Sequence, residues 1–236
     1  MIAVIQAGGK GVRLHPYTMP LPKPLMPIGD LPIIEVIIKW LRRQGVTDTF
    51  ITLGHLGRLI QALCGDGSQW DTKIRYSVEP EPLGTIGPLK LLKDELKKTF
   101  FNINADLITD LSLRSLRAFH IKHGGLVTVA ATERVIRSEL GVFEIENDRM
   151  VAFREKPEIK YLASCGAYCM EPGVLDLIPN GVPYGFDDLM QNMIEQKLPV
   201  YVYHHKGLWL DIGREEDFRN AQQAFDKDYK MRILGL

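Results

Sequence analysis

The stretch GGKGVRLHPYTMPLPKPLMP, residues 8–27, follows a short apolar run at residues 2–5 that predicts a first β-strand. Near its start, Gly8, Gly9 and Gly11 let the backbone turn tightly and approach a ligand where a Cβ would collide. Successive backbone N–H groups in such a turn can point inward and bind an anion. The stretch therefore predicts a phosphate site at the end of the first strand.

Two cations in the same stretch support this interpretation. Arg13 offers a planar set of donors that suits phosphate oxygens, and Lys23 offers a mobile point charge. Prolines at positions 16, 20, 22, 24 and 27 stiffen the loop, so that less ordering is needed when a ligand binds. Because a loop this long without secondary structure of its own is usually functional, we favour a binding loop over a simple surface connection.

Two well-known phosphate loops do not fit the spacing. A P-loop requires G-x-x-x-x-G-K-[ST], which residues 8–11 and their neighbours do not supply. The dinucleotide fingerprint G-x-G-x-x-G fails at Leu14, where its last glycine should stand. The phosphate site must therefore belong to another class.

Beyond the loop, helical and strand-like periodicities alternate along the chain. An amphipathic helix is predicted over residues 32–44, with Gly45 as its cap, and further helices are predicted at about 86–97, at 112–123 with Gly124 as cap, and at about 173–178. Strands are predicted at 49–53, 73–78, 99–104, 126–132, 164–170 and 200–204, and residues 141–154 predict a hairpin with its turn at 147–148. This order and spacing predict right-handed crossovers between parallel strands. The fold class is therefore α/β, and ligands are expected at the carboxyl ends of the strands.

A carboxylate, Asp106, follows the strand predicted at residues 99–104. This position suits a Mg²⁺ ligand, because magnesium prefers one or two carboxylates together with substrate phosphates. A lone aspartate after a strand is more often a helix cap or a turn residue. The metal interpretation therefore depends on what the rest of the chain supplies.

Residues 8–27 resemble the signature G-G-x-G-[ST]-R-L-x-P-x-T…P-K-P of sugar-phosphate nucleotidyltransferases, and the resemblance continues at intervals to about residue 220. It implies a Rossmann-like three-layer α/β sandwich with a mostly parallel central sheet, of the nucleotide-diphospho-sugar transferase type. It also implies transfer of a nucleotidyl group from an NTP to a sugar 1-phosphate, which gives an NDP-sugar and pyrophosphate. Positioning and charge neutralisation would carry such a reaction, since no covalent intermediate is required.

The resemblance also implies roles for individual residues. Arg13 and Lys23 would be catalytic, and Asp106 and Asp211 would hold Mg²⁺, two carboxylates that repel each other when no cation lies between them. The remaining assignments fall into two groups. The nucleotide-binding residues would be Ala7, Gly8, Gly9, Gly11, Arg13, Glu79, Leu83, Gly84 and Thr85, and the sugar-phosphate-binding residues would be Gly141, Glu155 and Lys156.

Substrate choice depends on two further segments. Residues 79–89, EPEPLGTIGPL, are closest in wording to mannose-1-phosphate guanylyltransferases, which favours GTP and a mannose- or heptose-type sugar. At residues 164–168 the chain reads SCGAY where relatives typically have N-A-G-[IM]-Y. The missing asparagine removes a sugar contact and leaves the identity of the sugar open, so that a non-sugar phosphate acceptor is an alternative. UTP, CTP and dTTP are the alternatives to GTP.

Composition limits the function classes further. The 236 residues carry a formal net charge of zero, so bulk charge indicates neither a nucleic-acid nor a membrane partner. Cys64, Cys165 and Cys169 are too few and too irregular for a disulfide framework or a zinc site. With no signal peptide or bilayer-length apolar run, we expect one cytoplasmic nucleotidyltransferase domain over residues 1–236, without a C-terminal β-helix, as a monomer or homodimer.

Two other classes remain open at this stage. A non-catalytic regulatory relative would bind NDP-sugar, but it would usually have lost the signature lysine or a metal aspartate, and this chain keeps them. A glycosyltransferase would generally carry D-x-D near the metal site. The only such motif here lies at residues 226–228 in the C-terminal tail.

Overall fold

The computed structural model describes residues 1–213, 215–225 and 227–235, except for the side chains at positions 211, 216, 224 and 227–229. The strands are β1 Ile2–Ala7, β2 Pro27–Ile28, β3 Leu31–Pro32, β4 Asp48–Leu53, β5 Lys73–Val78, β6 Phe100–Asn104, β7 Leu107–Thr109, β8 Val127–Arg137, β9 Val142–Glu146, β10 Arg149–Arg154, β11 Glu158–Met170, β12 Val200–His204 and β13 Trp209–Asp211. The α-helices are α1 Ile33–Arg43, α2 Gly57–Cys64, α3 Leu113–His123, α4 Phe186–Glu195, α5 Glu215–Ala224 and α6 Lys227–Leu234. Short 3-10 helices are η1 Val12–Leu14, η2 Lys23–Leu25, η3 Ser68–Trp70, η4 Gly87–Leu92 and η5 Pro172–Leu177.

A seven-stranded sheet in the order β12-β8-β11-β6-β1-β4-β5 forms the centre of the molecule. Its strands pair in parallel except for β11, which runs antiparallel to both β6 and β8. The buried strands are rich in β-branched and aromatic residues, as parallel strands covered on both faces require. The prediction of a mostly parallel central sheet is confirmed.

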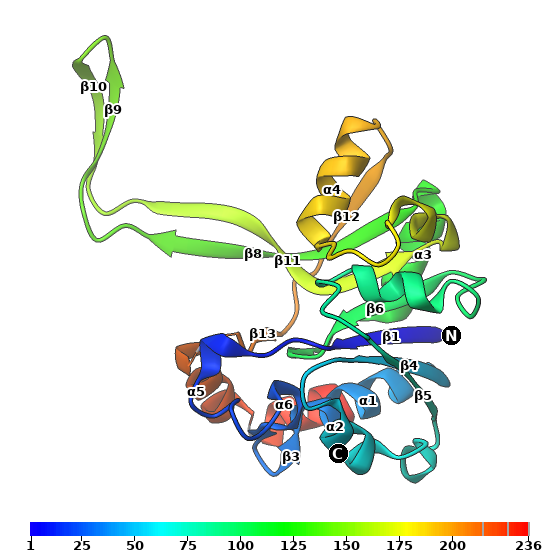
Figure 1. Ribbon diagram of the computed structural model, residues 1–236. Coiled ribbons are helices and arrows are strands. Elements are labelled where there is room, and N and C mark those ends of the chain that lie inside the picture. The colour runs from blue at the N-terminus through cyan, green and yellow to red at the C-terminus, as the bar shows by residue number, and fades with distance from the viewer. Residues whose placement is uncertain (214, 226, 236) are drawn as a thin grey trace.

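Helices cover both faces of this sheet, and each face has its own core (Figure 1). Alternate residues of β1 point to opposite faces, so that Ala3 and Ile5 join one core while Val4 joins the other. The first core also contains the apolar sides of α1, α3 and α6, and the second contains those of η4 and α4. The result is the predicted three-layer sandwich.

Three chain segments leave the sheet at the same edge. The register pairs Ala7 with Leu53 and Gln6 with Asn104, so β1, β4 and β6 end level with one another. The glycine loop, Gly54 and Asp106 therefore gather at the carboxyl ends of parallel strands, where open α/β sheets bind ligands. Within the described part of the chain, no helix is long and apolar enough to cross a membrane.

Several predicted elements differ from those observed. An α-helix was expected from residue 86 to residue 97, but the segment forms the 3-10 helix η4 followed by turns. The backbone N–H groups of Ile86 and Gly87 both donate to the carbonyl of Tyr184, which ties the start of η4 to the segment before α4. The segment predicted as a helix at 173–178 is likewise a 3-10 helix, and α6 was not predicted.

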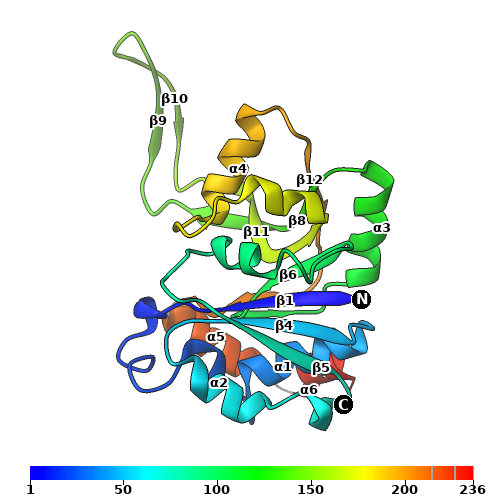
Figure 2. The same ribbon diagram turned by 45° about the vertical axis from the view of Figure 1, so that its right-hand side comes forward.

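A long antiparallel ribbon, residues 132–163, projects from the sheet, and we call it the arm. It consists of the outer halves of β8 and β11 and the β9–β10 hairpin between them (Figure 1). The predicted hairpin is confirmed, but the sequence predicted only seven residues of β8 and seven of β11. A second view shows that the arm points away from the rest of the molecule (Figure 2).

Candidate functional site

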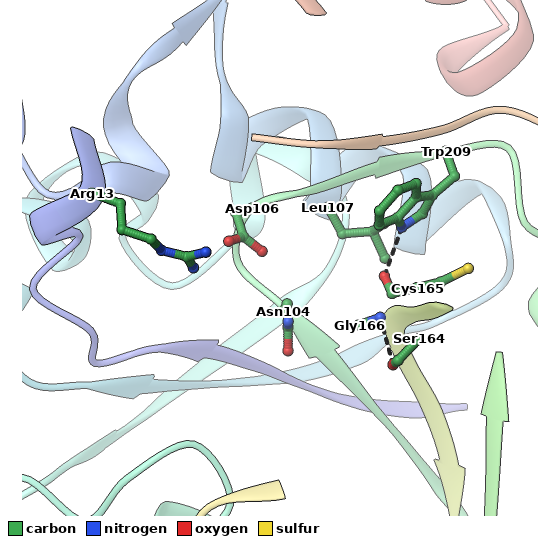
Figure 3. A pocket seen from close by; sticks show the side chains of 8 residues that line it. All are labelled: Arg13, Asn104, Asp106, Leu107, Ser164, Cys165, Gly166 and Trp209. Carbon is green, nitrogen blue, oxygen red and sulfur yellow. Dashed lines mark hydrogen bonds between the residues drawn. The ribbon is translucent and has the colours of Figure 1, made fainter. Parts of the chain in front are cut away.

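A polar cavity opens at the carboxyl edge of the sheet. It lies between the glycine loop, the end of β6, the middle of β11 and the start of β13 (Figure 3). Arg13 is the only cationic side chain among the described residues that line it. The lining residues are Arg13, Asn104, Asp106, Leu107, Ser164, Cys165, Gly166 and Trp209.

The glycine loop has the conformation that its sequence predicts. Gly11 has φ +63°, in the left-handed region where a side chain is strained, and an added Cβ would lie 3.2–3.3 Å from atoms of Thr18 and Lys23. The Thr18 hydroxyl donates to the Gly11 carbonyl at 2.8 Å and closes the turn. Leu14 is buried beneath the loop, while Arg13 points into the cavity (Figure 3).

Lys23 and Asp106, which are 83 residues apart in the sequence, form an ion pair at the edge of the cavity. Both side chains are largely buried, at 11% and 22% exposed, so the pair is only partly screened by solvent. The two residues were assigned separate roles, one in catalysis and one in metal binding. The structure places them in direct contact, so that Lys23 neutralises Asp106 when no metal is bound.

The second aspartate assigned to the metal lies next to the first along the backbone. Strand β13 pairs antiparallel with β7, so that Asp211 lies opposite Leu107, and the N–H of Ile212 donates to the carbonyl of Asp106 at 3.4 Å. The side chain of Asp211 lies outside the described residues. The backbone of β13 therefore brings Asp211 to the same edge of the sheet as Asp106.

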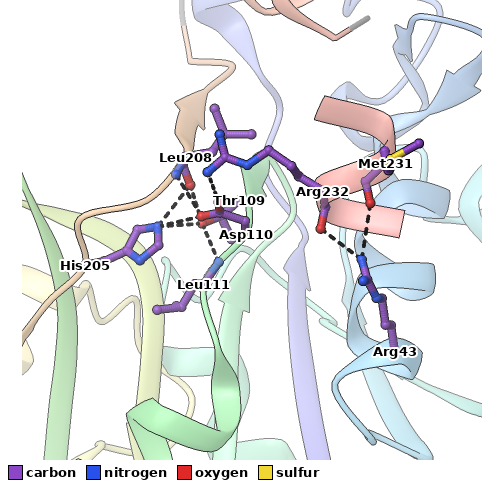
Figure 4. A network of polar contacts seen from close by, with 8 residues as sticks. All are labelled: Arg43, Thr109, Asp110, Leu111, His205, Leu208, Met231 and Arg232. Carbon is purple, nitrogen blue, oxygen red and sulfur yellow. Dashed lines mark hydrogen bonds and ion pairs between the residues drawn. The ribbon is translucent and has the colours of Figure 1, made fainter. Parts of the chain in front are cut away.

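A polar network fixes the segment that leads into β13 (Figure 4). Asp110, just after β7, accepts a hydrogen bond from the N–H of Leu208 at 2.7 Å and forms ion pairs with Arg232 of α6 and with His205 when that ring is protonated. The Thr109 hydroxyl donates to the Leu208 carbonyl at 2.7 Å. These contacts hold β13 beside β7 and thus position Trp209 and the backbone of Asp211 at the cavity.

The donor set at this edge suits a hard divalent cation. Asp106 presents a carboxylate to the cavity beside the glycine loop, and Mg²⁺ takes oxygen ligands, usually one or two carboxylates together with phosphate oxygens. Among the side chains that the structure describes, no three His, Cys, Asp or Glu gather as a closed metal cage. The carboxylate of Asp106 fits a Mg²⁺ ion whose other ligands include phosphate oxygens of the substrates.

The predicted base-binding segment meets the glycine loop through Glu79. A Cβ added at Gly8 would lie 2.1 Å from Glu79 Oε1, so only glycine allows this approach. The other carboxylate oxygen accepts a hydrogen bond from the N–H of Leu83 at 2.9 Å. Burial raises the pKa of the Glu79 carboxyl above its ordinary value of 4.5, and the hydrogen bond from Leu83 partly opposes that rise. Glu79 thus joins two segments that were predicted to share the nucleotide.

The rest of this segment is held by residues from a distant part of the chain. Gly84 has φ +81°, and an added Cβ would lie 2.7 Å from the carbonyl oxygen of Tyr184. The Thr85 hydroxyl accepts a hydrogen bond from the N–H of Phe186, at the start of α4, and the Tyr184 N–H donates to the Leu83 carbonyl. Gly84 and Thr85 therefore have packing roles as well as the binding roles that were predicted.

Glu79→Gln is expected to raise the melting temperature at pH 7.5 by roughly 1–3 °C, because it removes a partly buried charge while keeping an acceptor for Leu83. A carboxyl whose pKa is raised on folding destabilises the fold increasingly as the pH rises above its unfolded-state pKa, and the effect is complete above its folded-state pKa. The difference from wild type should therefore shrink as the pH is lowered toward 4.5. Thermal unfolding from pH 7.5 to 4.5 measures this, with the exposed Glu81→Gln as control, and a pH-independent difference would contradict it.

The three residues predicted to bind the sugar phosphate lie elsewhere. Gly141, Glu155 and Lys156 are in the arm at the base of the β9–β10 hairpin, and none of them lines the cavity. Gly141 and Glu155 are close to each other, since a Cβ added at Gly141 would lie 3.2 Å from Glu155 Oε2. The structure groups these residues with one another but does not bring them to the cavity of their own chain.

Other cavity residues were not predicted from the sequence. Ser164 and Gly166 lie at an irregularity in the β8–β11 pairing, where Gly166 has φ +71° and packs against the side chain of Asn104. Trp209 donates from Nε1 to the Cys165 carbonyl at 3.0 Å, and the Arg134 guanidinium lies 5.1 Å from the centre of its ring. The departure from the N-A-G pattern at residues 164–166 was the one signal that pointed here.

The three cysteines are buried in the structure. Cys64, Cys165 and Cys169 are free thiols. Burial raises the pKa of each thiol to about 12, which favours the thiol over the reactive thiolate at neutral pH. This includes Cys165, which lines the cavity.

Comparison with known proteins identifies the family of this chain. Residues 2–228 match the family model for nucleotidyl transferases. The chain is 35% identical over 227 residues to mannose-1-phosphate guanyltransferase of Saccharomyces cerevisiae and 30% identical over 241 residues to UTP–glucose-1-phosphate uridylyltransferase of a Synechocystis species. These alignments cover 92% and 94% of this chain but only 63% and 62% of the relatives, so the chain spans less than two thirds of their length.

Solved structures share the fold. HddC from Yersinia pseudotuberculosis in complex with GMP-PN superposes with a TM-score of 0.74 at 21% identity, covering 95% of this chain and 99% of the other. UDP-glucose pyrophosphorylase in complex with UDP-glucose gives 0.73 at 20% identity, covering 96% and 98%. With the match over residues 2–228, the chain belongs to the nucleotidyl transferase family.

Proposed function

We propose that this protein transfers a nucleotidyl group from an NTP to a sugar 1-phosphate and releases pyrophosphate. The observation that carries the proposal is the convergence of Arg13, Lys23 and Asp106 on one cavity beside the glycine loop. These groups neutralise phosphate charge, and in-line attack on an α-phosphorus requires positioning and charge neutralisation rather than a protein nucleophile.

Each group has a distinct task in this reaction. The backbone N–H groups of Gly8, Gly9 and Gly11 bind nucleotide phosphate oxygens, and Arg13 holds the pyrophosphate that leaves. Lys23 neutralises the charge that develops around the α-phosphate. Asp106 and Asp211 would hold Mg²⁺, which acts as a Lewis acid and a template for phosphate oxygens when bound.

The ion pair between Lys23 and Asp106 has a consequence for this scheme. Lys23 forms its ion pair with Oδ2 of Asp106, a residue that lines the cavity. A cation that binds Asp106 takes over the neutralisation of this carboxylate and thereby frees the lysine ammonium for substrate phosphate. Binding of the metal–nucleotide complex and release of Lys23 are therefore coupled.

For the substrates we propose GTP and a mannose- or heptose-type sugar 1-phosphate. The sequence of residues 79–89 supports this choice, as do the fungal relatives named mannose-1-phosphate guanyltransferase. Glu79 and the backbone of Leu83 lie beside Gly8, where a base would stack next to the loop. Because a uridylyltransferase matches at 30% identity, UTP is the first alternative to test.

The test is a matrix of four NTPs against several sugar 1-phosphates, with pyrophosphate release measured at fixed Mg²⁺. We expect GTP to exceed the other nucleotides in kcat/KM by roughly 10-fold or more, since a site that pairs with base donors rejects a base that lacks them. A preference for UTP, CTP or dTTP would overturn the base assignment and leave the reaction class intact. No release with any pair would overturn the reaction class itself.

A further inference from the structure

The arm exposes an apolar face that no described residue of its own chain covers. Directly paired residues of an antiparallel hairpin share a face, so the pairs Phe143–Phe153 and Ile145–Met150 lie on one side of the β9–β10 hairpin. These four side chains are 51–64% exposed. A two-stranded hairpin is at best marginally stable alone, and a contiguous exposed apolar patch marks an interaction site. Nearly half of the exposed large apolar side chains in the described part of the molecule lie in the arm.

Lys156, at the turn between β10 and β11, has two features of a functional residue. Its φ is +45°, a left-handed conformation that costs a non-glycine residue of the order of 1–3 kcal/mol and is concentrated at binding sites. Its ammonium forms no hydrogen bond or ion pair with any described residue, whereas Arg137, Arg154 and Lys160 of the arm are all paired. The strain and the free charge both point to a partner outside the arm.

The arm cannot deliver Lys156 to the cavity of its own chain. Ser164 lines that cavity, and the ladder between β8 and β11 is continuous from the Ser164–Ala131 pair outward to the Glu158–Arg137 pair. Six residues of extended strand span roughly 20 Å, and Lys156 lies beyond their far end. Bending the β9–β10 hairpin at its base does not move Lys156, because Lys156 lies at that base. Lys156 could reach the cavity of its own chain only if the paired strands β8 and β11 separated.

The cavity has few cationic side chains to bind phosphate, and the arm carries one in Lys156. Arg13 is its only cation among the described lining residues, and Lys23 is already paired with Asp106. Two phosphate-bearing substrates bring more negative charge than these groups balance. The loop at its rim also exposes apolar side chains that match the hairpin face, namely Val12, Tyr17 and Met19, each at least 50% exposed.

We propose that two copies of this chain exchange arms, so that the hairpin of each packs on the 12–19 loop of the other and places Lys156 at the partner's cavity. A second copy is the occupant because the loop and cavity that complement the arm are on this same chain. Reciprocal exchange is closed by a two-fold axis and covers both apolar faces at once. Each complete site then takes Lys23 and Asp106 from one copy and the acceptor-binding lysine from the other. This inference rests on the proposed function.

Complementation between two inactive variants tests the exchange. Lys23→Ala and Lys156→Ala chains carrying different tags are co-expressed, and dimers with both tags are purified. One site of such a dimer combines the intact Lys23 of one chain with the intact Lys156 of the other, so we expect about half of the wild-type activity per dimer. Each variant alone should show at least a 10-fold lower rate with sugar 1-phosphate. If every chain used its own arm, no site would be complete, and mixed dimers no more active than the single variants would overturn the proposal.

A second measurement uses the apolar face. Phe143→Asp with Phe153→Asp should convert the dimer to a monomer in light scattering and raise the KM for sugar 1-phosphate by 10-fold or more, while the KM for NTP stays within a few-fold. Arg149→Ala, which removes another arm cation without an ion-pair partner in the described residues, is the matched control and should change neither property. An active wild type that is monomeric would overturn arm exchange alone. A wild type that is inactive with every substrate pair would overturn the proposed function, and with it the shared site.

Discussion

Replacing Lys23 by alanine is expected to lower kcat by roughly 100-fold or more, with a much smaller change in the affinity for nucleotide. The reason is that the ammonium counteracts charge that grows around the α-phosphate during transfer, and an interaction stronger in the transition state than in the ground state acts on kcat. Steady-state kinetics at saturating Mg²⁺, together with direct nucleotide binding, separate the two effects. Turnover within a few-fold of wild type would remove Lys23 from the catalytic groups.

The ion pair with Asp106 adds a second readout to the same variant. Without Lys23, Asp106 has no competing cation, so the half-saturating Mg²⁺ concentration is expected to fall or to stay the same while kcat drops. Lys93→Ala is a matched control, because Lys93 forms a comparable but exposed ion pair with Asp176 at 2.6 Å. That variant should change neither kcat nor the Mg²⁺ requirement. A rise in the Mg²⁺ requirement of Lys23→Ala would show that the lysine helps to hold the metal rather than to replace it.

Local sequence signals predicted the framework of this protein well. Strands 73–78 and 200–204 are confirmed at the predicted residues, and Gly124 caps α3 with φ +70° as its position predicted. These features depend on alternation and on glycine conformations, which act over a few residues. The gathering of the glycine loop and Asp106 followed from one further rule, that parallel strands present their carboxyl ends at a common edge.

What the sequence did not predict depends on contacts between distant segments. The ion pair of Lys23 with Asp106 joins residues on separate loops, and no local pattern indicates that one will neutralise the other. The start of η4 is held by the carbonyl of Tyr184, about a hundred residues downstream, and the local pattern of residues 86–97 does not show this contact. The extension of β8 and β11 into the arm depends on which strands pair. The alternation of apolar residues along a strand does not show how many residues of it stay paired with a neighbour.

The three residues predicted to bind the sugar phosphate illustrate the same limit most clearly. The resemblance assigned Lys156 to the sugar phosphate, yet a sequence motif carries no information about which copy of the chain supplies a residue to a site. The register from Ser164 to Glu158 fixes how far the motif lies from the cavity of its own chain. Assignment of a residue to a reaction and assignment of a residue to a subunit are therefore separate questions, and the second requires the strand pairing.

The second large effect is expected at the two aspartates. Asp106→Asn and Asp211→Asn should each lower activity by roughly 100-fold or more at physiological Mg²⁺ and raise the Mg²⁺ concentration needed for half-maximal rate, because each removes one carboxylate ligand. The double variant should be little worse than the poorer single one, since residues that act as a unit are not additive. Initial rates against Mg²⁺ concentration for wild type, both single variants and the double variant measure this. Multiplicative losses with an unchanged Mg²⁺ requirement would show that the two aspartates do not share a metal.

Stability without metal separates the roles of these residues further. Two carboxylates alone would repel each other, so that removing either charge would stabilise the metal-free fold. The structure changes this expectation for Asp106, whose charge is already balanced by Lys23 in a partly buried pair. Asp106→Asn should therefore lower the metal-free melting temperature by about 2–4 °C, corresponding to a loss of about 1 kcal/mol. In the Lys23→Ala background the sign should reverse, because the carboxylate then has no partner to lose. Thermal unfolding in EDTA of Asp106→Asn, of Lys23→Ala and of the variant that carries both changes completes this cycle. Additive changes in melting temperature would mean that the ion pair contributes nothing in solution.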